Sequence, residues 1–170
     1  KFIYENIHSN EIEAKLLILS PKEILLSDKL LERNELKFLI TEYERELVNF
    51  PENYFAEDKN KIIIKEYYEI NNIDAIGNLG KKEITALGAI INYLIVTQKD
   101  NLPQLEYPKR ELQKNYLEID KTTLKSLEIF HSNNNIKASL INFLDNTQTA
   151  SAARSLREII AKPSVDIKIG

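Results

Sequence analysis

One amphipathic segment limits the folds open to this chain more than any other feature. Residues 82–97 carry large apolar side chains at helical spacing, namely Ile84, Leu87, Ile91 and Leu94. Small residues at Ala86, Gly88 and Ala89 on the same segment permit a second element to approach closely. The sequence therefore predicts a long helix packed tightly against a sheet or another helix.

A segment bounded by prolines follows this helix and marks the expected domain boundary. Pro103 and Pro108 disfavour helix in the residues before them and indicate an extended connection. This interpretation divides the chain into a domain over residues 1–105, a linker over residues 106–111 and a second domain over residues 112–170. Pro103 and Pro108 are accordingly the candidate hinge residues.

The first domain shows a pattern of alternating strands and helices. Its expected elements are a weak strand over 1–7, a helix between Ser9 and Pro21, a buried strand over 24–26, a strand near 36–42 and a helix over 53–68. The strand near 36–42 rests on the alternation of Leu36, Phe38 and Ile40, although a helix is also compatible with its charged residues. The strand–helix–strand order predicts an α/β layer with parallel neighbours.

The second domain is expected to be mostly helical. A short strand over 116–119 precedes three helices, and Asp120, Ser139 and Thr149 each stand where a capping side chain is expected. Pro163 ends the last helix.

Charge and composition weigh against several classes of protein. A net charge of −3 argues against an autonomous nucleic-acid-binding domain, and the absence of cysteine excludes disulfides and thiolate metal sites. No apolar run approaches the roughly 18 residues that suggest a membrane span, so no membrane partner is expected. A basic cluster near the boundary is interleaved with acidic residues, which favours a solvated surface over a DNA-facing or domain-facing one; it comprises Lys109, Arg110, Lys114, Lys121 and Lys125.

Residues with catalytic or ligand-binding potential are scattered along the sequence. The segment Gly77–Lys81 is too short for a phosphate loop and lacks its Ser or Thr, so a turn before the helix is favoured. His8 and His131 lie in or beside polar segments, and a solvated role is favoured over a metal or acid–base role. Carboxylates are numerous without a metal-binding arrangement. We therefore assign no catalytic, cofactor-binding or metal-binding residues.

Three blocks in a fixed order resemble the MutS family. They are Ala86–Leu94 followed by Thr97–Pro103; Tyr116–Asp120 with Thr123 and Leu127–Ile129; and Ser139–Asp145 with Thr147, Thr149, Arg154, Leu156 and Pro163. Residues 1–80 fit the family more loosely. Ala152 and Ile159 depart from the Gly and Trp that are usual in the family.

The resemblance implies an α/β fold, with an RNase H-like connector domain followed by an α-helical segment of the lever domain. It implies an internal part of a cytoplasmic, nucleoid-associated bacterial protein that binds mispaired DNA and uses ATP and magnesium. The resemblance implies that the family's mismatch-reading Phe-x-Glu motif belongs to another domain, and the four glycines of this sequence cannot form the family's phosphate loop. No enzyme activity and no cofactor are therefore expected of this part. The implied partners are the other MutS domains, a second MutS subunit, MutL, and mismatched DNA through other domains.

The role expected from the resemblance is to relay conformational change between domains. Arg154 matches an arginine of the family, and a structural ion pair with Asp145 is favoured over a ligand-binding role. Two alternatives remain open. One is a protein-interaction scaffold unrelated to repair, and the other is a metal-dependent nuclease on an RNase H-like fold.

Overall fold

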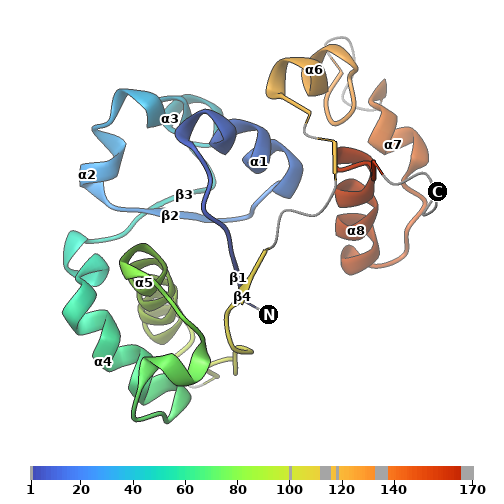
Figure 1. Ribbon diagram of the computed structural model, residues 1–170. Coiled ribbons are helices and arrows are strands. Elements are labelled where there is room, and N and C mark those ends of the chain that lie inside the picture. Colours follow the sequence, from blue (N-terminus) through green and yellow to red (C-terminus); the bar gives the residue numbers. More distant parts are fainter. Residues whose placement is uncertain (1, 100, 112–115, 118, 133–137, 166–170) are drawn as a thin grey trace. The chain divides into compact units, whose positions relative to one another are not determined.

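Two compact units make up the structure, a computed structural model that describes residues 2–99, 101–111, 116–117, 119–132 and 138–165 (Figure 1). Unit 1 combines residues 1–6 with 23–111, and unit 2 combines residues 7–22 with 112–170. The compact units thus differ from the expected domains at residues 7–22, which pack with the C-terminal part of the chain.

Unit 1 contains short parallel strand pairs and helices. Its strands are β1 (Ile3–Tyr4), β2 (Ile24–Leu26), β3 (Leu47–Asn49) and β4 (Lys109–Arg110), and its helices are α2 (Asp28–Leu31), α3 (Phe38–Glu42), α4 (Glu57–Tyr68) and α5 (Lys81–Thr97). Strand β1 pairs with β4, and β2 pairs with β3, both in parallel. The parallel neighbours expected from the sequence are present, but these strands form two separate pairs rather than one layer.

The prediction of a strand near residues 36–42 is wrong, because this segment is helical. Asn34–Leu36 form a turn of 3-10 helix, and α3 follows directly. Leu36 and Leu39 are the buried side chains, and their spacing of three residues follows the helical period, whereas Ile40 is 47% exposed. Burial here selects every third residue rather than every second, and the partner of β2 is β3, further along the chain.

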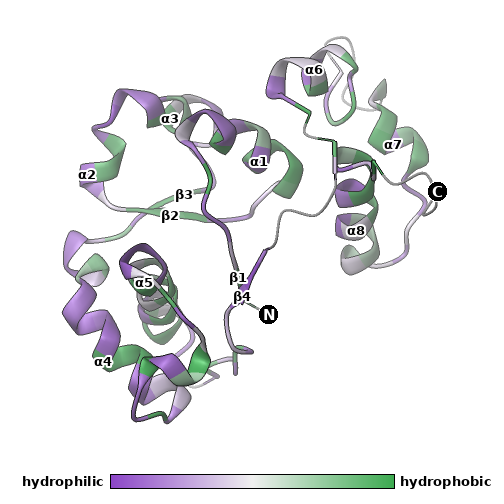
Figure 2. Cartoon of the chain, viewed as in Figure 1, coloured by the Kyte–Doolittle hydropathy of each residue, from purple (hydrophilic) through white to green (hydrophobic). Residues whose placement is uncertain are grey.

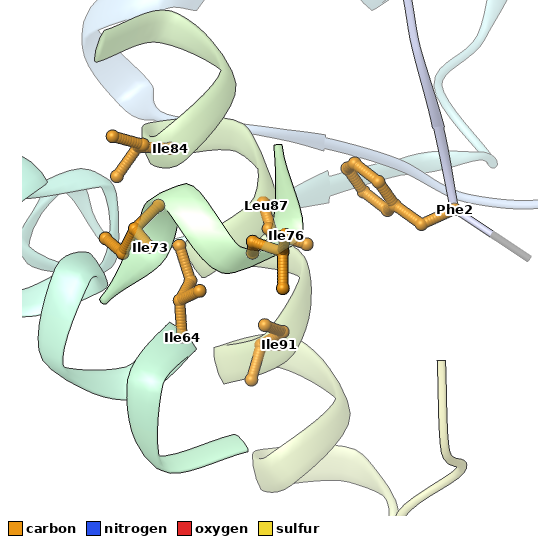
Figure 3. Packing of buried hydrophobic residues seen from close by; sticks show 7 residues of the cluster. All are labelled: Phe2, Ile64, Ile73, Ile76, Ile84, Leu87 and Ile91. Carbon is orange, nitrogen blue, oxygen red and sulfur yellow. The ribbon is translucent and has the colours of Figure 1, made fainter. Parts of the chain in front are cut away.

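The core of unit 1 forms where α4 and α5 pack together. Figure 3 shows Ile64 of α4 beside isoleucine and leucine side chains of α5 and of the 3-10 turn Ile73–Ile76, with Phe2, the residue before β1, at the edge of the group. The buried cluster comprises Phe2, Ile64, Ile73, Ile76, Ile84, Leu87 and Ile91. Its members on α5 confirm the apolar face predicted from the sequence, and the helix has nearly the predicted bounds.

A polar pair lies inside this apolar interface. Asn60 of α4 is fully buried, and its side-chain amide donates to the carbonyls of Tyr54 and Thr85 at 3.0 and 3.1 Å. The amide of Asn92 donates to the Asn60 side-chain oxygen at 3.1 Å and to the Gly88 carbonyl at 2.9 Å. Gly88 lies directly against Asn60, so the small residue noted in the sequence marks the closest approach of the two helices.

Unit 2 is built from four helices of the described chain. They are α1 (Ile12–Leu19), preceded by the 3-10 turn Ser9–Glu11, and α6 (Lys121–Ser126), α7 (Leu140–Leu144) and α8 (Ala150–Ala161). Their buried cluster contains Leu17, Leu124, Ile129, Phe130, Ile141 and Ala161. Figure 2 shows the hydrophobic character of α7, whose Phe143 is 81% exposed. None of the helices over the described residues combines the length and apolar character that crossing a membrane requires.

The predicted capping residues begin the helices of unit 2. Asp120 accepts a hydrogen bond from the Thr123 amide at 2.9 Å, and Thr149 accepts one from the Ala152 amide at 3.2 Å. Ser139 stands at the N-cap of α7, but within the described part of the chain its buried hydroxyl has no hydrogen-bond partner. The strand expected over 116–119 is represented by one antiparallel bridge between Tyr116 and Ser164, and residue 118 lies outside the described residues.

The cap at Thr149 permits a stability test. We expect Thr149→Ala to lower the free energy of unfolding by about 1 kcal/mol, because an amide in the first turn of α8 loses its acceptor. Urea denaturation followed by far-ultraviolet circular dichroism measures the change. Ser151→Ala alters an exposed residue in the same turn and should change stability by less than about 0.5 kcal/mol. Equal effects of the two substitutions would show that the Thr149 cap contributes nothing.

Candidate functional site: the exit segment of unit 1

Residues 103–111 form the last part of unit 1, and we call them the exit segment. This segment contains both predicted hinge residues and the whole predicted linker. Before β4 it belongs to no helix or strand, which agrees with the helix-breaking effect of the prolines. Its contacts show how firmly the predicted hinge is held.

Two adjacent tyrosines at the end of α4 bind the exit segment. The Tyr67 hydroxyl donates to the Pro103 carbonyl and accepts from the Leu105 amide at 2.8 Å. The Tyr68 hydroxyl donates to the Glu106 carbonyl at 3.1 Å, and its ring meets the Tyr107 ring edge to face, with centroids 5.4 Å apart. Burial raises the pKa of Tyr68 to about 12, so its phenol stays protonated and remains a donor.

Backbone hydrogen bonds fix the following residues to β1. The Lys109 amide donates to the Phe2 carbonyl at 3.0 Å, and the Glu111 amide donates to the Tyr4 carbonyl at 2.8 Å. Phe2 belongs to the core of unit 1, so this pairing ties the exit segment to the core. Pro103 and Pro108 therefore lie in a bound stretch of chain, and the prolines limit its backbone freedom further.

Two lysines of the predicted basic cluster pair with acidic side chains within their own units. Lys109 pairs with Glu106 at 3.2 Å, and Lys121 pairs with Glu13 at 2.7 Å. Lys114 lies outside the described residues. Acidic neighbours thus accompany these lysines, as the interleaved sequence suggests.

The structure does not bring Arg154 and Asp145 together in the predicted ion pair over the described residues. Asp145 accepts hydrogen bonds from the Thr147 amide and hydroxyl, at 3.0 and 2.7 Å, and these bonds lower the pKa of its carboxyl. Arg154 is exposed, and it forms no ion pair with Asp145 among the described residues. The hydrogen bonds from Thr147 within the turn already satisfy the Asp145 carboxylate, so it needs no arginine of α8 as a partner.

Sequence reasoning missed the residues that make the most specific polar contacts. Tyr67 and Tyr68 stand side by side at the end of an amphipathic helix, and that adjacency is the signal that was available. Arg157 lies one turn after Arg154 on α8, and its guanidinium donates to two backbone carbonyls. Nothing in the local sequence separates these two arginines, because the distinction depends on residues about 140 positions away.

The segment Gly77–Lys81 is a turn that leads into α5. Gly77 adopts φ 123°, a conformation that suits glycine, and Gly80 is the N-cap residue of the helix. The Glu83 carboxylate lies over this N-terminus and accepts a hydrogen bond from Asn6 at 2.7 Å. The Asn6 hydrogen bond, followed by the amide of Glu83 itself, lowers the pKa of Glu83. A negative charge at this position opposes phosphate binding.

The remaining candidates for chemistry are separated in space. Within the described ranges, no group of three or more histidine and carboxylate side chains is arranged to hold a metal ion. The His8 amide donates to Glu11 at 2.9 Å in the turn before α1. Burial, and then the charges of Arg157 and Lys125, lowers the pKa of His131 and favours its neutral ring.

Fold and contacts together define a class of protein segment. It consists of helices with small parallel strand pairs, and its polar contacts hold segments of the same chain together. The comparison with known families then identifies which family such a segment comes from. Residues 1–106 match the family model described as MutS domain II, and residues 122–169 match that of MutS domain III.

The chain belongs to the MutS family. It is 34% identical over 164 residues to the DNA mismatch repair protein MutS of Wolbachia pipientis, covering 96% of this chain and 19% of the relative. It is 32% identical over 170 residues to the MutS of Orientia tsutsugamushi strain Boryong, and 33% identical over 168 residues to that of Rickettsia prowazekii. These matches cover 99% and 98% of this chain, and 19% of each relative. The chain thus spans about a fifth of the length of these curated relatives.

Proposed function

We propose that this chain is a connecting part of a MutS mismatch-repair protein and relays conformational change between its domains. The exit segment is the observation that supports this role. Hydrogen bonds attach it to α4 and to the β1 region. In this proposal, that attachment would make unit 1 and the chain that leaves it move together. A change in the orientation of unit 1 would then pass to the following residues as a rigid-body movement. In this proposal Pro103 and Pro108 stiffen the connection instead of flexing as hinges.

The proposal assigns the chemistry to the rest of the protein. Mismatched DNA, ATP and magnesium would bind to domains outside this chain, in a cytoplasmic, nucleoid-associated dimer. Unit 1 would correspond to an RNase H-like connector domain, which the parallel pairing of its strands supports. Unit 1 would also offer a surface to MutL. Binding of MutL to the full-length protein, with and without substitutions on exposed faces of unit 1, tests that contact.

The relay is tested by removing the two tyrosine hydroxyls in the full-length protein. Tyr67→Phe with Tyr68→Phe keeps both rings and deletes the hydrogen bonds to the exit segment. We expect ATP-dependent release from a mismatch to slow by about fivefold or more, the range of typical coupling free energies. Mismatch affinity without nucleotide should stay unchanged, because the DNA-binding domain is untouched.

A matched control separates this effect from general damage. Tyr116→Phe removes a hydroxyl that makes no hydrogen bond over the described residues, and it should leave release unchanged. Hydrogen exchange provides the structural readout, since amides of residues 105–111 should exchange faster in the double variant. If those amides exchange faster while release keeps its normal rate, the exit segment does not act in a relay.

A further inference from the structure

Helix α1 leaves unit 1 and packs within unit 2, although the MutS domain II match includes its residues. We infer that α1 is a clasp through which domain II holds domain III, and that Arg157 is the positioning residue that locks it. The surface that receives the clasp belongs to unit 2, and its occupant is residues 12–19 of the same chain. This inference concerns how the chain is held together and stands apart from the proposed repair function.

Arg157 of α8 binds the C-terminal end of α1. Its Nε donates to the Ile18 carbonyl at 2.9 Å, and a terminal guanidinium nitrogen donates to the Leu17 carbonyl at 3.0 Å. Carbonyls of the last helical turn have no partner within the helix, and a positive charge there complements the helix dipole. The two bonds therefore recognise the end of a helix, with the charge and the geometry that such an end requires.

The Phe130 ring holds this guanidinium in place. Its centroid lies 4.1 Å from the central carbon of the Arg157 guanidinium, a cation–π contact. Phe130 is itself buried in the core of unit 2, at 4% exposure. The Phe130 ring thus holds the Arg157 guanidinium while its N–H groups donate to α1. A lysine at this position does not reproduce that arrangement.

Apolar and ionic contacts extend the clasp along α1. Leu17 is 8% exposed and belongs to the same buried cluster as Leu124 and Phe130, with Ala14 and Ile18 packed against it. Near the other end of α1, Glu13 pairs with Lys121 at 2.7 Å, and both side chains are partly covered. One face of the helix is therefore held by three kinds of contact, whereas Leu19 at its end is 63% exposed.

The docking of α1 in unit 2 determines how many chain connections restrain the two units. The chain enters unit 2 after residue 6, returns after residue 22 and leaves unit 1 again after residue 111. With α1 bound, three connections restrain the units, whereas release of α1 would leave a single effective restraint beyond residue 111. Arg157 would thereby set how freely domains II and III move relative to each other.

A zero-length carbodiimide cross-link tests the docking of α1 in the full chain. The Lys121 amine should form an amide with the Glu13 carboxyl, because these groups lie 2.7 Å apart, and peptide mass spectrometry identifies the product. Lys121→Arg keeps the positive charge and should abolish that product. Absence of the cross-link in the unmodified chain would overturn the clasp.

The role of Arg157 is tested by Arg157→Lys and Arg157→Gln, with Arg154→Gln as the control on the exposed part of α8. We expect amides of residues 16–20 to exchange about tenfold faster or more in both Arg157 variants, because two charge-assisted hydrogen bonds are lost. The yield of the Glu13–Lys121 cross-link should fall in parallel, while amides of α8 stay protected. Unchanged exchange in residues 16–20 would remove Arg157 from the clasp.

The restraint itself is measurable because the chain contains no cysteine. Spin labels attached to cysteines at Lys59 in unit 1 and Ser155 in unit 2 report the distribution of distances between the units. We expect Arg157→Gln to broaden that distribution and Arg154→Gln to leave it unchanged. Equal widths in the two variants would show that α1 does not restrain the units.

Discussion

Replacing Gly88 with alanine should lower the free energy of unfolding by about 3 kcal/mol, although alanine is the better helix former. A methyl group at this position would lie 2.3 Å from Cβ and Cγ of Asn60, much closer than carbon atoms tolerate. Both atoms belong to a fully buried side chain on α4, so α4 and α5 must separate to make room. Urea denaturation followed by circular dichroism measures the loss.

Ala86→Ser provides the matched control for this prediction. It adds one heavy atom to the exposed face of the same helix and should change stability by less than about 0.5 kcal/mol. A Gly88→Ala variant as stable as the unmodified chain would mean that α4 and α5 do not approach each other as closely as the structure shows. An increase in stability would mean that helix propensity alone decides the outcome at this position.

Replacing Asn60 with aspartate should cost about 4 kcal/mol near pH 7, from a change of only a few atoms. The amide of Asn60 donates to the carbonyls of Tyr54 and Thr85, and a carboxylate would place negative charge against both oxygens. The buried acid would remain protonated in the folded state, because desolvation raises its pKa. In that form it has a single donor for two acceptors.

The cost of this substitution depends on pH in a defined direction. A raised folded-state pKa means that the unfolded chain releases its proton first as pH rises, so the loss of stability grows between about pH 4 and pH 7. Asn53→Asp makes the same chemical change at an exposed position and should stay within about 0.5 kcal/mol of the unmodified chain. A loss for Asn60→Asp that does not vary with pH would exclude a buried acid at this site.

Local patterns in the sequence determined the elements whose apolar spacing and capping hydrogen bonds involve only residues close together in the chain. The apolar face of α5, the strand over 24–26 and the caps at Asp120 and Thr149 were all predictable. Each depends on spacing or hydrogen bonds between near neighbours, so no distant residue is required. The three blocks that resemble MutS lie between residues 86 and 163, and the family matches over 1–106 and 122–169 confirm that resemblance.

Contacts between distant residues decided the rest. Residues 36–42 became a helix because burial selected Leu36 and Leu39, and α1 joined unit 2 because Leu17 entered its core. The sequence marked Gly88 as a place of close approach, but only the tertiary structure supplied Asn60 as its neighbour. Likewise, Arg157 differs from Arg154 only through the carbonyls it meets on α1. Local sequence sets which conformations are favourable, whereas burial and long-range hydrogen bonds decide which of them the folded chain adopts.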